Sequence, residues 1–319
     1  MNVIDRFRGP HQCFSNFELY PVEFEDMWFP STEHAFHAAK TFDLRIRRTI
    51  QAAATARNAK QLGQQLPLRP DWEQVKYSIM AQLQHIKFTT NPQLCSRLVT
   101  TGDDLLIEGN SWQDDTWGRC RKPGFTCLIG KNWLGRILMQ LRRELRSDPR
   151  DRWPRVALTG HREERITPAT HPWLRAELAR IISKLRDHHG TQVALTGLAT
   201  GADIWWAQAA EAAGLPFWGY QPFPSQTARW RTDQQAEHVR LRNRAHRLVL
   251  VGEHAHKQHF DLRNDLMITD ADAVVAVRDP EITSGGTVSA LKRYCGGKPV
   301  IMIDVRNRRT TIHAIYQHR

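Results

Sequence analysis

Three side chains that could do acid–base and nucleophilic chemistry occur at helical spacing near the start of the chain. Glu33, His37 and Lys40 are related by i, i+4 and i+7, which places them on one face of an α-helix. A carboxylate, an imidazole and an amine on one face can together supply an acid, a base and a nucleophile. The alternative is a solvated polar stripe on a surface helix, because charged pairs at this spacing are common there.

The residues around this face predict the helix that would carry it. Pro30 ends an apolar extended run, and Ser31 or Thr32 can then cap the first amides of a helix over 33–40. The other side of this helix carries small alanines. We therefore expect a helix that packs closely on one side and presents its three polar groups on the other.

A second group of candidate residues lies in a glycine- and asparagine-rich loop after the apolar strand predicted at 105–108. Asp114 and Trp117 belong to this loop, and catalytic groups are often mounted on loops that follow buried strands. With Trp72, the tryptophans offer flat apolar faces beside carboxylates, as a pocket for a heterocyclic base requires. Taken singly, each tryptophan could equally be a core anchor and each acid a turn former.

Residues 1–148 read as a mainly helical α+β domain. Phenylalanines interleaved with turn residues at its start indicate short strands. Further helices are predicted at 44–62 with Gly63 as the C-cap, from Asp71 as an N-cap, at 91–100 and at 136–145. A polar, helix-breaking stretch at 147–152 then makes a linker.

Composition limits the class of protein. The 319 residues are 41% hydrophobic and 24% charged, and this length predicts two domains. Five scattered cysteines without a CxxC pair argue against a disulfide framework or a structural zinc, and no apolar run approaches the length of a membrane span. We therefore expect a cytoplasmic protein with no membrane partner. The net charge of +12, spread through both predicted domains, suits a phosphorylated or polyanionic partner.

Strands alternate with helices from 152 to 305, which predicts an α/β domain with a doubly wound parallel sheet. The strands are expected at 155–158, 192–195, 216–220, 248–251, 273–277 and 300–303. Residues 306–319 are expected as a basic C-terminal tail. Three histidines at 254–259 lack an acidic or thiolate partner at a suitable spacing, so we expect no metal, and we expect no cofactor.

Three glycine-bearing turns fall at the predicted carboxyl ends of these strands, where such sheets bind their ligands. They lie at 159–162, 197–201 and 284–287. Glycine lets the backbone approach a phosphate, and a following helix N-terminus supplies amides and a favourable dipole. Loops in α/β proteins also use glycine for structural reasons, but three such turns at one edge predict a phosphate-bearing ligand.

The order of motifs through the first domain resembles the NADAR family, the YbiA-like proteins. The motifs are Ser15-Asn16-Phe17, Pro30-Ser31-Thr32-Glu33-His34, Lys40, Asp71-Trp72-Glu73, Lys87-Phe88, Glu108-Gly109-Asn110, Asp114-Asp115-Thr116-Trp117-Gly118, Gly130-Lys131-Asn132-Trp133-Leu134-Gly135 and Leu138-Met139. Known members are N-glycosidases. They cleave a ribose-to-nitrogen bond in riboflavin-pathway intermediates, or they remove ADP-ribose from modified guanine in nucleic acid.

The resemblance implies site residues as well as a reaction. It implies Lys40 as a covalent catalytic residue, with Glu33 and Asp114 as the other catalytic residues. It implies these residues for substrate binding: Asn16, Phe17, His34, Trp72, Trp117 and Asn132. The chemistry agrees, because a ribosylamine can open to an imine that a lysine attacks and holds as a Schiff base. Glu33 is then the natural proton shuttle, and Asp114 either shares that role or positions a ribose hydroxyl.

The second domain carries the motifs Thr159-Gly160-His161-Arg162, Thr196-Gly197-Leu198-Ala199-Thr200-Gly201-Ala202-Asp203, Pro222-Phe223-Pro224, Asn264, Ala271-Asp272 and Gly285-Gly286-Thr287. In these motifs it resembles the SLOG superfamily, a Rossmann-like group that includes YpsA-like, DprA-like and cytokinin-activating LOG proteins. This resemblance implies an NAD-derived nucleotide as the ligand. The nucleotide-binding residues that it implies are Gly160, His161, Arg162, Gly197, Gly201, Ala202, Asp203, Asn264, Gly285, Gly286 and Thr287. LOG enzymes follow their glycine-threonine turn with a glutamate, whereas Val288-Ser289-Ala290 follows here. The domain is therefore expected to bind a nucleotide without hydrolysing it, with a purely structural Rossmann domain as the alternative.

The leading hypothesis is an N-glycosidase that acts on an ADP-ribose- or ribose-phosphate-linked base, in a small molecule or in ADP-ribosylated nucleic acid. One alternative is a DprA-like nucleic-acid-binding protein, whose affinity would collapse with salt and would not depend on Lys40. Another is a sensor that sequesters an NAD-derived nucleotide without turnover. A homo-oligomer is compatible with each of these hypotheses.

Overall fold

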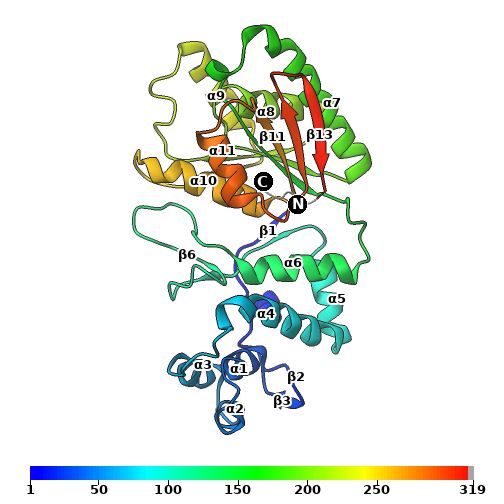
Figure 1. Cartoon of the computed structure of the whole chain (residues 1–319), viewed down its shortest axis with the longest axis vertical. Helices are drawn as coiled ribbons and strands as arrows, with labels where there is room; N and C mark the ends of the chain where they lie inside the picture. Colours follow the sequence, from blue (N-terminus) through cyan, green and yellow to red (C-terminus); the bar gives the residue numbers. More distant parts are fainter. Residues whose placement is uncertain (315–319) are drawn as a thin grey trace. The chain divides into compact units, whose positions relative to one another are not determined.

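The computed structural model describes residues 1–314 and divides the chain into two compact units (Figure 1). The first unit contains Met1–Cys120 and Gly130–Asp148, and the second contains Arg121–Ile129 and the chain from Pro149 onward. The segment 121–129, which the sequence places inside the first domain, belongs instead with the second unit. Its Thr126 amide donates to the carbonyl oxygen of Val251 over 3.0 Å.

The first unit is mainly helical, and short two-stranded sheets tie its loops together. Its helices are α1 (Thr32–Ala38), α2 (Leu44–Gln51), α3 (Ala56–Gln64), α4 (Trp72–Thr89), α5 (Pro92–Thr100) and α6 (Trp133–Leu145), with a 3-10 helix at Gly9–Phe14. The strand pairs are β1 (Val3–Ile4) with β4 (Leu105–Leu106), β2 (Val22–Phe24) with β3 (Met27–Phe29), and β5 (Gly109–Asn110) with β6 (Arg119–Cys120). Helix α1 lies at the centre, in contact with α2, α3 and α4.

The start of α1 follows the prediction from the sequence. The Ser31 hydroxyl accepts a hydrogen bond from the His34 amide over 3.4 Å, so Ser31 and not Thr32 is the cap. Ala35 and Ala38 are completely buried, as expected for close packing of this helix.

One other prediction for the first unit was wrong, and one was confirmed only in part. The helix expected at 44–62 is broken into α2 and α3, because the Thr55 hydroxyl accepts from the Asn58 amide over 3.1 Å and starts a new helix. Gly63 consequently lies inside α3 and is not its C-cap. Asp71 stands at the N-cap position of α4 but makes no capping bond, because its carboxylate pairs with Arg69 over 2.6 Å.

A seven-stranded sheet forms the centre of the second unit. Its strands are β7 (Arg155–Gly160), β8 (Val193–Thr196), β9 (Phe217–Gln221), β10 (Arg247–Leu250), β11 (Ala273–Arg278), β12 (Val300–Asp304) and β13 (Arg309–His313). They are ordered β10-β9-β8-β7-β11-β12-β13, and all neighbours are parallel except β12 and β13. The six strands expected from the sequence are confirmed. Strand β13 lies in the stretch expected as a tail, and the end of that stretch, 315–319, is outside the described residues.

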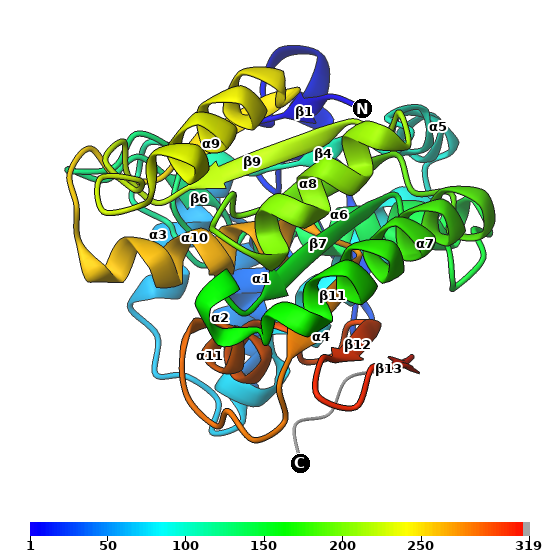
Figure 2. The ribbon, with the colours of Figure 1, turned by 90° about the horizontal axis from the view of Figure 1, so that it is seen from above.

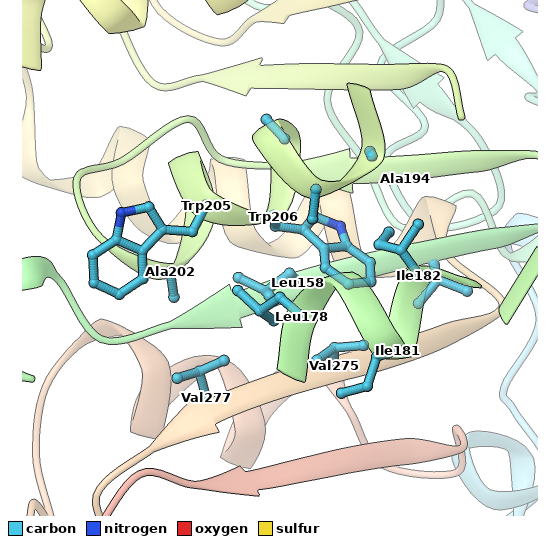
Figure 3. Close-up of a cluster of buried hydrophobic side chains, with 14 of the residues drawn as sticks. Leu158, Leu178, Ile181, Ile182, Ala194, Ala202, Trp205, Trp206, Val275 and Val277 are labelled. Carbon is cyan, nitrogen blue, oxygen red and sulfur yellow. The ribbon is translucent and has the colours of Figure 1, made fainter. Parts of the chain in front are cut away.

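Helices cover both faces of this sheet. Strand residues Val156, Leu158, Val275 and Val277 belong to one buried cluster with residues of α7 (His171–His189) and α8 (Ala202–Ala212), and Leu241 of α9 (Thr232–Arg244) joins it (Figure 3). Figure 2 shows α8 lying over β7 and β9. Helices α10 (Lys257–Asp270) and α11 (Gly286–Tyr294) contact each other and the sheet, outside this cluster. Helix α9 was not expected from the sequence.

Residues 1–314 include no helix that is both long enough and apolar enough to cross a membrane.

Candidate active site

A cavity of about 980 Å³ opens within the first unit, and most of the predicted catalytic and substrate-binding residues line it. This size lies at the upper end of the range for small-molecule sites, roughly 300–1,000 Å³. The predicted residues on its wall are Asn16, Phe17, Glu33, Lys40, Trp72, Asp114 and Trp117. Segments far apart in the sequence therefore meet at one place.

Helix α1 presents the acid–base pair of the cavity. His37 Nε2 lies 3.2 Å from Glu33 Oε1, and both side chains are buried. Burial lowers the pKa of His37, although the hydrogen bond and the negative charge of Glu33 oppose that shift. The pair is set into the wall and is not a solvated surface stripe.

Lys40 reaches the cavity by a different route from the one predicted. Helix α1 ends at Ala38, so Lys40 does not continue the helical face of Glu33 and His37. Its Nζ donates to the carbonyl oxygen of Gly63 over 3.2 Å and lies 5.9 Å from the ring of Trp72. Burial lowers the pKa of Lys40 and the charge of Lys60 adds to that shift, while Glu33 opposes it. Lys40 is thus an amine whose neutral form is made more accessible, as a nucleophile requires.

Aromatic rings form an apolar wall beside these groups. The ring of Phe36, from α1, lies 5.1 Å from both Trp72 and Trp117 between centroids. Trp112 also lines the cavity and is 46% exposed. A planar base could lie against these faces. Trp133 instead contacts Tyr77, with 4.5 Å between ring centroids.

The cavity wall also carries basic side chains that the sequence did not single out. They are Arg8, Arg57, Lys60 and Lys76. Lys60 Nζ lies 5.5 Å from the ring of Phe17, and Lys76 pairs with Glu73. Arg57 and Lys60 come from α3, whose separate existence the sequence did not reveal.

Asp114 lines the cavity and also holds its own loop. Asp114 Oδ1 accepts the amides of Thr116 over 3.0 Å and Trp117 over 2.9 Å. The Asn110 side chain makes two hydrogen bonds to the backbone of Asp114. It donates to the Asp114 carbonyl oxygen over 2.7 Å and accepts from the Asp114 amide over 3.1 Å. Asp114 therefore positions Trp117 as well as offering a carboxylate oxygen.

Glu108 is a buried acid of the cavity that the sequence did not select as a site residue. Its burial, with the negative charges of Asp114 and Glu33, raises the pKa of Glu108 to about 8. The signal in the sequence is a charged residue at the end of an otherwise apolar strand. Such a residue is costly to bury without a reason.

The structure places two predicted substrate-binding residues away from the cavity wall. The ring nitrogens of His34 lie 2.8 Å from Ser31 Oγ and 3.1 Å from the carbonyl oxygen of Ala53. Asn132 accepts the Glu108 amide over 3.0 Å and donates to the carbonyl oxygen of Leu106 over 2.8 Å. Both side chains are 1% exposed and hold loops together.

In the second unit, two of the glycine turns meet beside β7. At this strand the order in which the chain adds strands to the sheet changes from one side of β7 to the other. Strand β7 lies between β8 and β11, and loops after such central strands form the usual ligand site. His161 follows β7 and its Nε2 is buried without a hydrogen-bond partner among residues 1–314. A Cβ at Gly201 would lie 2.4 Å from the Glu163 amide nitrogen, so Gly201 is required for packing of the chain on itself.

Other predicted residues at this edge are engaged with each other. Arg263 Nη1 lies 3.7 Å from Asp203 and also donates to the carbonyl oxygen of Gly197, while Arg263 Nε donates to Asn264 over 2.8 Å. Burial raises the pKa of Asp203 to about 6, although Arg263 opposes that shift. These groups brace the loop after β8.

The remaining predicted residues lie around the third turn and the first. Gly286 begins α11, and a Cβ there would meet nothing within 4 Å. Gly285 precedes it and Thr287 follows it, buried. At the first turn Gly160 packs against Ala202, and the Arg162 guanidinium lies 6.0 Å from the Phe260 ring.

No cluster of three or more metal-ligating side chains occurs within 1–314. His259 Nδ1 lies 3.0 Å from the carbonyl oxygen of His254, which accounts for one histidine of the group noted in the sequence.

Comparison with known proteins identifies the first unit. Residues 5–146 match the family model described as the NADAR domain. An N-glycosidase of Nostoc punctiforme, Npun_R5314, is 37% identical over 143 residues, which are 43% of this chain and 88% of that protein. The N-glycosidase YbiA of Escherichia coli is 32% identical over 138 residues, or 41% of this chain and 80% of that protein.

Two solved structures are also similar. The NMR structure of E. coli YbiA is 30% identical, covers 46% of this chain and 88% of that chain, and has a TM-score of 0.41. The structure of DNA processing protein A (DprA) from Streptococcus pneumoniae is 19% identical, covers 47% of this chain and 50% of that chain, and has a TM-score of 0.36. The sequence matches in the first unit confirm the predicted enzyme class, an N-glycosidase, and the chain belongs to the NADAR family.

Proposed function

We propose that the protein hydrolyses the bond between a ribose and a base nitrogen, removing ADP-ribose from guanine or from a related ribosylamine. The observation that carries this proposal is the placement of Lys40, Glu33 and a tryptophan wall around one cavity. Burial lowers the pKa of Lys40, which favours the neutral amine that a nucleophile requires. A ribosylamine offers the matching electrophile when its ring opens to an imine.

The reaction needs an amine and a proton relay. Lys40 Nζ adds to C1 of the open imine, and the base leaves while the sugar stays on Nζ as a protonated Schiff base. Water then adds to C1, and collapse of the adduct restores the amine and frees the sugar aldehyde. Glu33 carries protons between nitrogen and oxygen during addition and collapse, and its contact with His37 holds it in place.

The cavity also supports the choice of substrate. Trp72, Trp112 and Trp117 can face a purine, and Arg8, Arg57 and Lys60 can face a diphosphate. A cavity of about 980 Å³ has room for a nucleotide diphosphate as well as a base. Asn16 and Phe17 complete the wall beside Lys60.

For the second unit we propose a SLOG-like role in binding an NAD-derived nucleotide. Support comes from the central position of β7, the unpartnered Nε2 of His161 and the open approach to Gly286 at the start of α11. The buried Asp203–Arg263 pair is better suited to bracing the loop than to contacting a ligand.

The decisive experiment follows free ADP-ribose released from an ADP-ribosylated guanine oligonucleotide by wild type, Lys40→Ala and Lys40→Arg, with borohydride trapping in parallel. Wild type alone should release ADP-ribose and gain the mass of the reduced adduct. Lys40→Arg is the informative variant, because it keeps the charge but cannot form a Schiff base. Lys292→Arg, in the second unit, is the matched control and should behave as wild type.

The other outcomes separate the remaining hypotheses. Release by Lys40→Arg at the wild-type rate would contradict the covalent mechanism. Release only from ribosylated riboflavin intermediates would keep the mechanism and change the substrate. Stoichiometric nucleotide binding without release would favour a sensor, and oligonucleotide binding that falls steeply with salt would favour a nucleic-acid-binding protein.

A further inference from the structure

Glu108 stands apart from the other two carboxyls of the cavity. It lines the cavity and is only 8% exposed, and its Oε2 is buried with no hydrogen-bond partner in the described part of the chain. Glu33, by contrast, is paired with His37, and Asp114 accepts two amides of its own loop. An unpaired polar atom at this depth is costly and needs an explanation.

The backbone at Glu108 is fixed on both sides. Its amide donates to Asn132 Oδ1 over 3.0 Å, and its carbonyl oxygen accepts the Arg119 amide over 2.9 Å. A Cβ at Gly118 would lie 3.1 Å from Glu108 Cγ, so the side chain is confined as well. The carboxyl is therefore held in position before any ligand arrives, as a catalytic group should be.

The surroundings of Glu108 favour its protonated form. Burial is the main cause that raises its pKa to about 8, and the carboxylates of Asp114 and Glu33 act in the same direction. The charges of Arg8 and Lys87 act in the opposite direction. At neutral pH Glu108 thus holds a proton that it can donate, in the manner of other carboxylic acids placed in apolar sites.

The N-glycosidase reaction has a step that requires such a donor. A base nitrogen that leaves without a proton departs as an anion, which is unfavourable for an unactivated amine. Lys40 adds as the neutral amine, and Glu33 takes the proton that Nζ carries after addition to C1. Glu33 is occupied in relaying protons for Lys40.

We propose that Glu108 is the general acid that protonates the base nitrogen as its bond to C1 breaks, an inference that rests on the proposed reaction. The C1–Nζ bond has formed at this point, the C1–N bond to the base breaks, and the Glu108 proton goes to that nitrogen. The products are the neutral base, the protonated Schiff base of Lys40 and the Glu108 carboxylate. Water then adds to C1, and the proton that water loses restores Glu108.

The test compares wild type, Glu108→Gln and the exposed control Glu23→Gln on two ribosylated amines, one strongly and one weakly basic. For the basic leaving group, Glu108→Gln should lower kcat about 10²- to 10³-fold. For a ribosylated trinitroaniline, whose nitrogen can leave as a stabilised anion, the loss should be below about 10-fold. The decline of wild-type kcat/KM above about pH 8 should disappear in Glu108→Gln.

A second variant, Glu108→Asp, distinguishes the loss of an acidic group from a folding defect. Glu108→Asp keeps an acid one methylene shorter, so it should retain the high-pH decline and part of the activity. Equal losses on both amines for Glu108→Gln, or an unchanged rate on the basic amine, would overturn the role of Glu108. If Lys40→Arg is then still inactive, the proposed function survives. Absence of release by wild type from every substrate would overturn both proposals.

Discussion

The cavity of the first unit and the loop after β8 in the second unit both contain a buried carboxyl, but they surround it differently. Asp203 has Arg263 at 3.7 Å and accepts the Ala199 amide over 3.4 Å. Glu108 has a buried oxygen without a partner and two further carboxylates nearby. The pKa rises to about 6 for Asp203 and to about 8 for Glu108. The same degree of burial thus serves structure in one place and leaves a proton available in the other.

The largest change in stability should come from removing the carboxyl of Asp203, which is paired with Arg263. Asp203→Ala leaves the Arg263 guanidinium buried without its counter-charge, and the second unit should lose about 3–5 kcal/mol of stability. Hydrogen exchange of peptides from β8 and α10 would measure this loss. Asp233→Ala removes the acid of an exposed pair with Arg231 and should produce no measurable change. Similar exchange in both variants would mean that the buried pair does not brace the loop.

Removing the carboxyl of Glu108, which lacks a partner for Oε2, should raise the free energy of unfolding and not lower it. Because the pKa of Glu108 is raised in the folded state, the unfolded state releases this proton first, and stability falls as pH rises from about 4.5 to about 8. Glu108→Gln avoids this cost, so it should be more stable than wild type by about 4 kcal/mol at pH 8 and equal to it near pH 4.5. Urea unfolding at the two pH values measures the difference. A constant difference across pH would refute the assigned titration.

A smaller effect should follow from crowding the acid–base pair. A Cβ at Gly63 would lie 2.3 Å from His37 Nδ1, so Gly63→Ala must push α3 away from α1 and disturb the contact of His37 with Glu33. Overpacking costs about 1–3 kcal/mol, of which helix propensity returns about 1. Thermal unfolding should show this loss, and turnover should fall with it. Gly296→Ala, where a Cβ meets nothing within 4 Å, is the control and should match wild type.

The smallest effect on stability should occur at Gly286. Its surroundings are open, so Gly286→Ala should change stability by less than about 0.5 kcal/mol. If the second unit binds a nucleotide phosphate at the start of α11, affinity for ADP-ribose measured by calorimetry should nevertheless weaken. Unchanged affinity would move the nucleotide site away from α11.

The strands of the second unit were predictable because each is a short apolar run bounded by turns, and this pattern depends little on the rest of the fold. Helix α9 could not be predicted from an apolar pattern, because its buried residues are Gln234, His238 and Leu241, and only the last of these is apolar. The break between α2 and α3 depends on the cap at Thr55, which resembles many other threonines in the sequence.

The site was predictable to a different extent. Spacing brought Glu33 and His37 together, but Lys40 reaches the same cavity only because the chain turns after Ala38. Both Asn132 and Asp114 lie in family motifs, and the motifs alone do not show which of them lines the cavity. The Asn132 side chain binds backbone groups of neighbouring loops, whereas Asp114 lines the cavity. The availability of Glu108 depends on burial and on neighbours from distant segments, which a single sequence does not display.

The assignment of 121–129 to the second unit has a consequence for synthesis of the chain. Thr126 pairs with Val251, and Phe125 forms a β-bridge with Gly252, more than a hundred residues further along. When a ribosome has completed the first unit, Phe125 and Thr126 lack these contacts until the chain up to residue 252 has emerged. A nascent chain halted near residue 150 should therefore be more sensitive to protease at Phe125 and Thr126 than the full chain.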